Sequence, residues 1–356
     1  MATLMPPGYF AATEYRFDEE QTDAIARTAA YHRRDYSLFV IWFSPRKHID
    51  IRSSIATPFR RTSNVGLGSL DRLPLELLYN SLFHLDMHSL FKFRQMNLRS
   101  RQTVDSVKQY QMVVSYGLNL VCALLRTHLA PGISLLDFYD ALCTKACSLC
   151  GEFGGFISLL TWKRCCFKCL REAPETQMQS RNAIRKRFHL TMIESDQLRS
   201  FKTLPGIYSM DEAIYKSRVA IVSVLQATLR RQKHVQLQSP PVSSEINQKF
   251  NFMGSCALPY YDKRTGKVEH GMSCAGCQLA VEKDIIGNSG EAWEFEVRDK
   301  VFARDGFWNI LDGVNRHSSS GYQVAEATTG QRSSQSLPGE EATLTIENDK
   351  DMKSVH

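Results

Sequence analysis

The sequence contains no segment that is typical of export or of membrane insertion. Its first ten residues, MATLMPPGYF, include neither a basic stretch nor an apolar stretch, so we expect no secretory signal. The longest early apolar run, Ser37–Phe43, is far shorter than the roughly 20 residues that span a bilayer. We therefore expect a protein of the cytoplasm, the nucleus or both, with no membrane partner. Disulfides are rare in these reducing compartments.

Motifs of the common catalytic classes are also missing. The chain has no H-E-x-x-H or zinc-deaminase signature, no P-loop, no G-x-S-x-G and no dinucleotide-binding fingerprint. It shows no internal repeat of solenoid length, and no WD40, leucine-rich or kelch repeat. These absences favour a protein that is not an enzyme.

Charge and hydrophobicity lie in the ordinary range of soluble globular proteins. Of the 356 residues, 43% are hydrophobic and 23% are charged, which is enough for two or three domain-sized units with a real core. The net charge of +7 is a mild excess over this length. Acidic partners are therefore compatible with the composition, but the charge does not require nucleic acid.

Cysteine, in contrast, is plentiful. The chain has ten cysteines, and five of them lie in the stretch CSLCGEFGGFISLLTWKRCCFKC. Two C-x2-C pairs, Cys147/Cys150 and Cys166/Cys169, are separated by fifteen residues, a spacing typical of a zinc site. The segment between the pairs suits a short hairpin or loop that returns the second pair to the first, and Gly151 suits the positive φ of a tight turn. We therefore predict structural zinc held by these four cysteines.

Alternatives for these thiols stay open at this point. Cys165 could replace Cys166 as the third ligand, because a C-x3-C turn is also allowed, and Cys143 lies one helical turn before the cluster. A thioredoxin-like redox pair needs a C-x2-C that follows a strand and opens a helix, and we expect neither pair to do so. Inert buried cysteines or a disulfide are the remaining alternatives.

A second stretch, CALPYYDKRTGKVEHGMSCAGC, offers another set of soft ligands. Three cysteines and a histidine form a legitimate zinc set, here Cys256, Cys274, Cys277 and His270. His317 is an alternative fourth ligand, and Cys274 with Cys277 could instead complete the first cluster. Catalytic zinc keeps an open position, usually among His and carboxylate ligands, so we expect structural rather than catalytic metal.

Helical spacing becomes clear after Leu67. Pro74 suits the first turn of a helix, Asp86 suits the N-cap of a second helix, and a third helix is expected from about Asn97 towards Tyr116. Further predictions are helical sequence over 117–142 with a break at 131–132, a basic helix over 180–189, a turn over 204–208 and an amphipathic helix over 211–231.

The expected fold class is mainly α, with an irregular helical domain and small zinc-braced loops or hairpins. The predicted regions are a weakly ordered N-terminal region over 1–66, a module of three short helices over 67–114, a helical domain with the first cysteine cluster over 115–235, a second cysteine-containing region over 236–310, and a disordered tail over 311–356.

The three short helices carry a resemblance. The segment LDRLPLELLYNSLFHLDMHSLFKFRQMNLRSRQTVDSV resembles an F-box, with its Leu-Pro pair, leucine-rich helix, Asp-led second helix and basic third helix. The order of this segment, the paired C-x2-C motifs, LPGIY and C…GMSCAGC is similar to that of F-box proteins common in filamentous fungi, over roughly Leu67 to Arg304. The sequence departs from this pattern where the third helix lacks a Trp and where the pattern ends after Arg304.

The resemblance implies a substrate receptor of an SCF-type cullin–RING ubiquitin ligase, an adaptor protein rather than an enzyme. The F-box would bind the Skp adaptor, and the rest of the chain would bind an unidentified protein client. Apolar helical faces dock through a few buried anchors. The positions that would face the adaptor are Leu73, Pro74, Leu77, Leu78, Leu82, Leu90 and Phe93.

Three other interpretations stay open. The same leucines could form only a private helical core. The stretch RNAIRKRFH and the positive net charge would suit a zinc-containing nucleic-acid-binding or regulatory protein, although basic runs are usually solvated helix faces. A thiol oxidoreductase that uses one C-x2-C pair is a third hypothesis.

Overall fold

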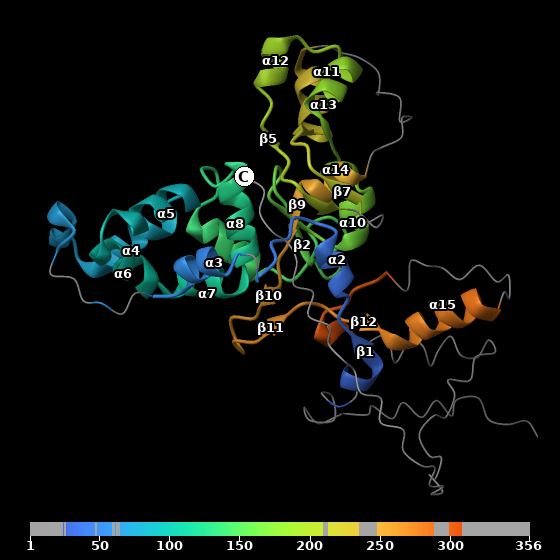
Figure 1. Ribbon diagram of the computed structural model, residues 1–356, viewed down its shortest axis with the longest axis horizontal. Coiled ribbons are helices and arrows are strands. Elements are labelled where there is room, and N and C mark those ends of the chain that lie inside the picture. The colour runs from blue at the N-terminus through green and yellow to red at the C-terminus, as the bar shows by residue number, and fades with distance from the viewer. Residues whose placement is uncertain are drawn as a thin grey trace, which may run out of the picture. The chain divides into compact units, whose positions relative to one another are not determined.

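The computed structural model describes residues 24, 26–46, 48–58, 61, 65–208, 213–234, 248–287 and 299–307 (Figure 1). Within these residues the chain is mainly helical, with several small sheets of two or three strands, as the sequence predicted. None of the described helices is long and apolar enough to cross a bilayer. The predicted tail over 311–356 lies outside the described residues.

Helices dominate the chain from residue 34 to residue 142. Asp86 accepts hydrogen bonds from the backbone N–H groups of His88 and Ser89, which caps one helix as predicted, and Asn97 and Ser134 form capping boxes for two others. The elements are α2 (Arg34–Leu38), α3 (Ile49–Ala56), the 3-10 turn η1 (Gly68–Arg72), α4 (Leu75–His84), α5 (Met87–Met96), α6 (Leu98–Ser106), α7 (Lys108–Tyr116), α8 (Leu118–Thr127) and α9 (Leu135–Leu142).

The single helix predicted over 97–116 is interrupted at Val107. This residue is extended, with φ −70° and ψ 115°, and its N–H donates to the carbonyl of Val104 to close α6. The interruption has a packing cause, because α6 packs on α5 whereas α7 packs on α8 and α9. Val107 itself is only 3% exposed and enters the core at the bend.

The hairpin predicted between the two cysteine pairs is present. β2 (Phe156–Ser158) pairs antiparallel with β3 (Lys163–Cys165), and β9 (Ser255–Ala257) pairs with the other edge of β2. This sheet therefore extends across the predicted boundary near residue 236, because β9 completes a sheet that begins in the first cysteine region. Ile157 and Cys256, which are paired in this sheet, are both 0% exposed in the main core.

A second sheet has the strand order β4-β8-β5, with β4 (Met178–Ser180), β8 (Ala220–Ser223) and β5 (Ser200–Lys202). Neighbouring side chains of a strand point to opposite sides. Ile221 accordingly packs into the main core, and Val222 packs with Ile184 and Phe188 of α11. α11 (Arg181–Phe188) and α13 (Val224–His234) contact each other and the central strand, and α12 (Met192–Asp196) packs on α11.

The amphipathic helix predicted over 211–231 is wrong in its first half. Residues 213–215 form β7, which pairs with β6 (Gly206–Tyr208) in the predicted LPGIY turn, and the helix begins only at Val224. Adjacent β-branched residues such as Ile221 and Val222, buried on opposite sides, suit a strand better than a one-faced helix. The basic helix predicted over 180–189 is confirmed as α11, which Ser180 caps.

The N-terminal segment was expected to be weakly ordered, but it is packed where the structure describes it. Its β1 (Ala30–Tyr31) pairs with β12 (Ser273–Cys274), and the N–H of Ile41 donates to the carbonyl of Ser255. Tyr36 and Ile41 are at most 2% exposed. The remaining elements are α10 (Phe167–Glu172), η2 (Pro174–Thr176), α14 (Lys249–Met253), β10 (Tyr260–Tyr261), β11 (Val268–Glu269) and α15 (Ala275–Gly287).

Candidate metal centre

A tight loop after α9 presents the first two thiols. The N–H of Gly151 donates to the carbonyl of Cys147, and the N–H of Cys147 donates to the carbonyl of Glu152. Gly151 has φ +80°, the left-handed conformation that the sequence predicted there. The loop folds Cys147 and Cys150 towards the same point, and the N–H of Leu149 donates to the Cys147 Sγ.

The second pair comes from the end of the hairpin. β3 ends at Cys165, Cys166 is the N-cap of α10, and the N–H of Cys169 donates to the Cys166 Sγ at 3.4 Å. This C-x2-C therefore does follow a strand and open a helix, which corrects the expectation made against a redox pair. Ser148 connects the two pairs, because both its N–H and its hydroxyl donate to the carbonyl of Arg164.

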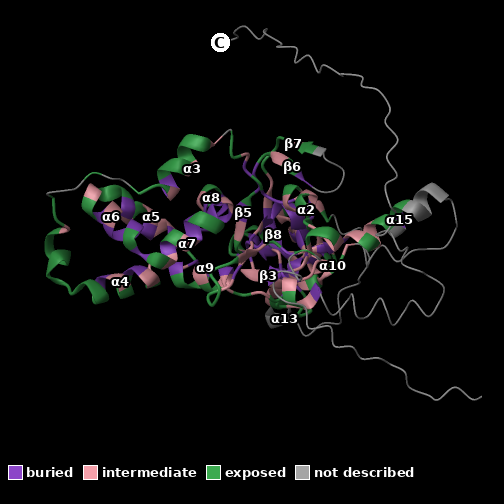
Figure 2. Cartoon of the chain, turned by 90° about the horizontal axis from the view of Figure 1, so that it is seen from below, coloured by how far each residue is buried: buried purple, intermediate pink, exposed green. Residues whose placement is uncertain are grey.

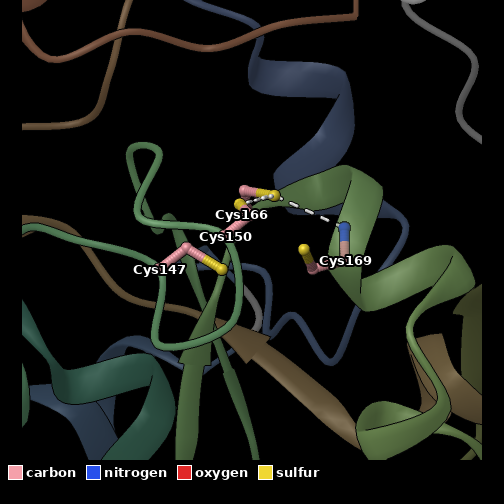
Figure 3. A group of neighbouring side chains, drawn as sticks. All are labelled: Cys147, Cys150, Cys166 and Cys169. Carbon is pink, nitrogen blue, oxygen red and sulfur yellow. Dashed lines mark hydrogen bonds between the residues drawn. The ribbon is translucent and has the colours of Figure 1, made fainter.

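The four cysteines form one cluster (Figure 3). The Sγ atoms of Cys147, Cys150, Cys166 and Cys169 all lie within 4.8 Å of one another, and the Cys150 and Cys166 sulfurs are 3.6 Å apart. A tetrahedron with metal–sulfur distances of 2.3 Å has sulfur–sulfur edges of roughly 3.8 Å. The cluster is therefore close enough to bind one metal ion, and its size and soft ligands are compatible with zinc.

The hydrogen bonds among these thiols also indicate that the cluster can bind a cation. The hydrogen bond with the Cys166 thiol lowers the pKa of Cys147 to about 4, helped by the backbone N–H groups of Cys150 and Leu149, whereas this bond raises the pKa of Cys166. Burial raises the pKa of Cys169 to about 12. Four thiols at this spacing do not all ionise in the absence of a cation, because each thiolate opposes the next. A divalent metal ion would remove that opposition.

The alternative ligand Cys165 points elsewhere. Its Sγ donates weakly to the carbonyl of Phe156 at 3.8 Å, it is 0% exposed, and burial raises its pKa. Cys166 continues the extended backbone of β3, with φ −78° and ψ 170°. Successive side chains of an extended chain point to opposite sides, so Cys165 and Cys166 cannot both face the cluster. The structure brings Cys166 into the cluster and leaves Cys165 in the core. Cys143 also lies outside the group of four.

Arg164 fixes the hairpin on which two of the ligands depend. Its guanidinium donates to the carbonyls of Gly154, Ala141 and Leu258 at 2.6, 2.7 and 2.9 Å. Its burial lowers its pKa to about 10. Sequence reasoning missed this residue, because the pattern of the strand does not distinguish it from its charged neighbour Lys163. Gly154 is required beside it, because a Cβ there would lie 2.9 Å from Arg164 Cγ.

The helix that carries Cys169 is held by aromatic and charged groups from distant segments. Phe167 stacks on Tyr36, with ring centroids 3.8 Å apart and an interplanar angle of 5°. The Tyr36 hydroxyl donates to Asp299 at 2.7 Å, and Arg33 and Arg171 also reach that carboxylate. Nothing in the sequence pattern singled out Tyr36 or Asp299, which lie far apart along the chain.

The second predicted zinc site is not assembled among the described residues. Cys256 is buried in β9, where its Sγ accepts from the Asn119 side chain at 3.1 Å. Cys274 ends β12, and a hydrogen bond with Cys277, in the first turn of α15, lowers the pKa of Cys274 to about 6. His270 instead pairs with the ring of His32, at a centroid distance of 5.2 Å. The four residues form no group that could share one ion, nor do Cys274 and Cys277 join the first cluster. His317 lies outside the described residues.

The leucines assigned to adaptor binding divide into an exposed set and a buried set. Figure 2 shows α4 coloured by the burial of its residues. Leu73 and Leu77 are 40% and 54% exposed, and Pro74 is also exposed at the start of α4. Phe93 is half-buried. The remaining three are Leu78, Leu82 and Leu90. They are at most 6% exposed, so their packing within this chain leaves them unavailable to a partner.

A cavity of about 530 Å³ lies beside the cysteine cluster. Cys150, Cys166 and Cys169 contribute to its wall. The ion pairs of its charged lining are internal, between Lys300 and Glu152 and between Arg171 and both Glu172 and Asp299. Lys168 also lines the cavity, so the lining has three cations and three anions and presents no excess of one charge to a ligand.

Comparison with known proteins adds no assignment to this geometry. No family model, no curated protein and no solved structure matches the chain.

Proposed function

We propose that this chain is the substrate receptor of an SCF-type cullin–RING ubiquitin ligase, and that it binds the Skp adaptor through the start of α4. The observation that carries the proposal is a run of exposed apolar side chains from η1 into the first turn of α4. Leu70, Leu73, Leu75 and Leu77 are 37%, 40%, 51% and 54% exposed, in a sequence that resembles the Leu-Pro start of an F-box. Exposed apolar groups that lie together in this way typically mark an interface.

The packing behind this run supports a docking role rather than a private core. Leu78 and Leu82 are buried, α4 packs on α9, and Leu75 lies on the same side of the helix as this buried pair, at its exposed start. Leu77 lies on a different side of α4 and is exposed. The helix therefore carries exposed leucines at its start beside the buried leucines that it uses internally. Helix-in-groove recognition uses apolar side chains presented in this manner, with a few anchors that carry most of the affinity.

The cysteine cluster has a structural role in this proposal. Four thiolates fill a tetrahedral zinc shell and leave no coordination position for a substrate or an activated water. The ion would hold the loop of Cys147 and Cys150 against the start of α10. It would thereby stabilise the part of the chain that receives the client. The proposed function is binding and presentation for ubiquitination, without catalysis by this chain.

The test is co-purification of the full chain with the Skp adaptor, followed by affinity measurement. Leu77→Asp places a charge in the proposed interface and is expected to weaken adaptor binding by more than about 30-fold, as for other anchors worth about 2 kcal/mol. Pro74→Ala is expected to weaken it to a smaller extent. Leu279→Asp in α15 is the matched control, because Leu279 is 55% exposed, as Leu77 is at 54%. The proposal fails if the unmodified chain does not bind the adaptor at micromolar concentration, or if the two Asp variants behave alike.

A further inference from the structure

One part of the chain that includes three packed helices carries an excess of positive charge. Residues 177–234 contain eleven Lys and Arg and four Asp and Glu, an excess that equals the net charge of +7 of the entire chain. In this part, α11, α12 and α13 form what we call the basic layer, on the side of the β4-β8-β5 sheet that faces away from the main core.

The three helices of the basic layer are joined by arginine side chains. Arg181 forms an ion pair with Asp196 at 2.7 Å, and Arg185 contacts the sulfur of Met192, so both connect α11 to α12. Arg230 of α13 donates to Gln197, which follows α12, at 2.7 Å. The layer is thus one continuous surface and not three separate helices.

Cations exceed anions on this surface, and the anions are engaged within it. Asp196 pairs with Arg181, and the Glu194 carboxylate accepts from the N–H and hydroxyl of Thr191 in the capping box of α12. The described side chains of α11, α12 and α13 include six cations against these two anions: Arg181, Arg185, Lys186, Arg187, Arg230 and Arg231. Their field attracts an acidic partner.

Exposed aliphatic side chains lie among these cations. Met192, Ile193 and Leu229 are 61%, 72% and 51% exposed. Among Phe, Tyr and Trp, the described helices of the layer carry only Phe188, which is 3% exposed, and the one exposed ring beside them is the imidazole of His189 at the end of α11. The layer therefore lacks a platform of large aromatic rings on which successive bases could stack. Sites for single-stranded nucleic acids typically combine cations with aromatic rings that stack on successive bases, and phosphates give no favourable contact to aliphatic groups. The mixture of cations and aliphatic side chains instead suits a protein segment that carries both carboxylates and aliphatic residues.

We infer that the basic layer is a docking surface for an acidic protein segment that also contains aliphatic side chains. In the receptor proposed above, this surface would select the client, and that biological role depends on the proposed function. Binding of such a segment does not depend on it, since the layer and the start of α4 belong to different elements.

The experiment measures binding of a labelled synthetic peptide that repeats Glu-Glu-Leu-Asp-Ser-Ile to the full chain, by fluorescence anisotropy at physiological ionic strength. The combined variant Lys186→Glu/Arg231→Glu is expected to weaken binding by about tenfold or more. Ile193→Ser/Leu229→Ser is expected to weaken it by about threefold or more. Lys263→Glu/Arg264→Glu, in the turn between β10 and β11, reverses two charges outside the layer and is expected to leave binding unchanged. Near-UV circular dichroism and metal content establish that each variant is folded.

Three results would overturn the inference. One is that the variants in the layer and the control variant weaken peptide binding equally. Another is that the chain binds a peptide in which Ser replaces Leu and Ile as tightly as it binds the original peptide. The third is a layer that binds a uridylate homopolymer or a DNA duplex while it ignores the peptide. Adaptor binding is measured on the same samples. Leu77→Asp must leave peptide binding intact and Lys186→Glu/Arg231→Glu must leave adaptor binding intact, so that failure of one proposal is distinguishable from failure of the other.

Discussion

Cys165 and Cys166 are adjacent and chemically identical, yet the structure gives them opposite roles. The Cys166 sulfur lies in the cluster, 3.6 Å from that of Cys150, and the Cys165 sulfur lies in the core against the carbonyl of Phe156. Substitution of each by alanine removes the same atom. We predict that Cys166→Ala loses the metal ion and that Cys165→Ala retains it.

The two substitutions are expected to cost different amounts of free energy, for physical reasons. Cys165→Ala removes one fully buried sulfur and leaves a small cavity, which costs about 1 kcal/mol of the free energy of unfolding, like other single-group deletions. Cys166→Ala removes one of four metal ligands. Structural zinc contributes about 10–16 kcal/mol in small zinc domains, so an equal share per ligand is about 3 kcal/mol, a loss of more than about 100-fold in metal affinity.

The assay is metal content per chain by mass spectrometry, combined with thermal unfolding in the presence and absence of a chelator. The unmodified chain and Cys165→Ala should carry one zinc ion and should melt at a lower temperature with chelator. Cys166→Ala should carry little metal and should melt at the same lower temperature with or without chelator. Cys256→Ala, a core cysteine outside the cluster, is the control and should behave like Cys165→Ala. If Cys165→Ala lost the metal and Cys166→Ala kept it, the ligand assignment would be wrong.

Three further substitutions test the framework. Arg164→Met leaves three backbone carbonyls without their donor and should lower the free energy of unfolding by about 3 kcal/mol or more, whereas Arg264→Met, at a side chain 89% exposed, should have almost no effect in the same denaturant titration. Asp86→Ala removes the cap of α5 and should cost about 1 kcal/mol at neutral pH. Burial acts to raise the pKa of Asp86, but hydrogen bonds from a neighbouring hydroxyl and backbone N–H groups lower this pKa overall. The difference in the free energy of unfolding between Asp86→Ala and the unmodified chain should therefore be complete above about pH 4 and should shrink as the pH falls further. Gly271→Ala forces a side chain to φ +81° and against Val301, and should cost about 1–2 kcal/mol in thermal unfolding, whereas Gly306→Ala, which meets no atom within 4 Å, should be neutral.

Local spacing was sufficient to predict which cysteine pairs meet, because a C-x2-C turn and a hairpin between the pairs are short-range structures. It could not choose between Cys165 and Cys166. Both satisfy the ligand spacing, and the choice depends on which side of β3 faces the cluster. That direction is set by the pairing of Phe156 with both Cys165 and Ala257, the latter about a hundred residues away along the chain.

The sequence-based predictions failed where structure depends on partners that are distant in sequence. The segment around Ile221 has an apolar pattern that fits an amphipathic helix. It forms the central strand β8 because β4 and β5 are available on both sides. The predicted set of Cys256 with Cys274 failed for a similar reason, since β9 is taken into the sheet with β2 while β12 pairs with β1. A ligand set from one cysteine-rich stretch is divided when its strands join different sheets.

The position of the cysteine cluster gives a physical reason for a metal ion in a protein that already has a large core. The ligands lie next to a smaller second core, in which Phe167 and Leu170 of α10 pack with Tyr36, Val40 and Phe252. These groups come from segments that are far apart in the chain, so each contact closes a long loop and carries the entropic cost of doing so. A small cluster of side chains offsets only part of that cost. Zinc binding at Cys166 and Cys169 would fix the start of α10, and the segments that pack on this helix would then meet a surface that is already in place.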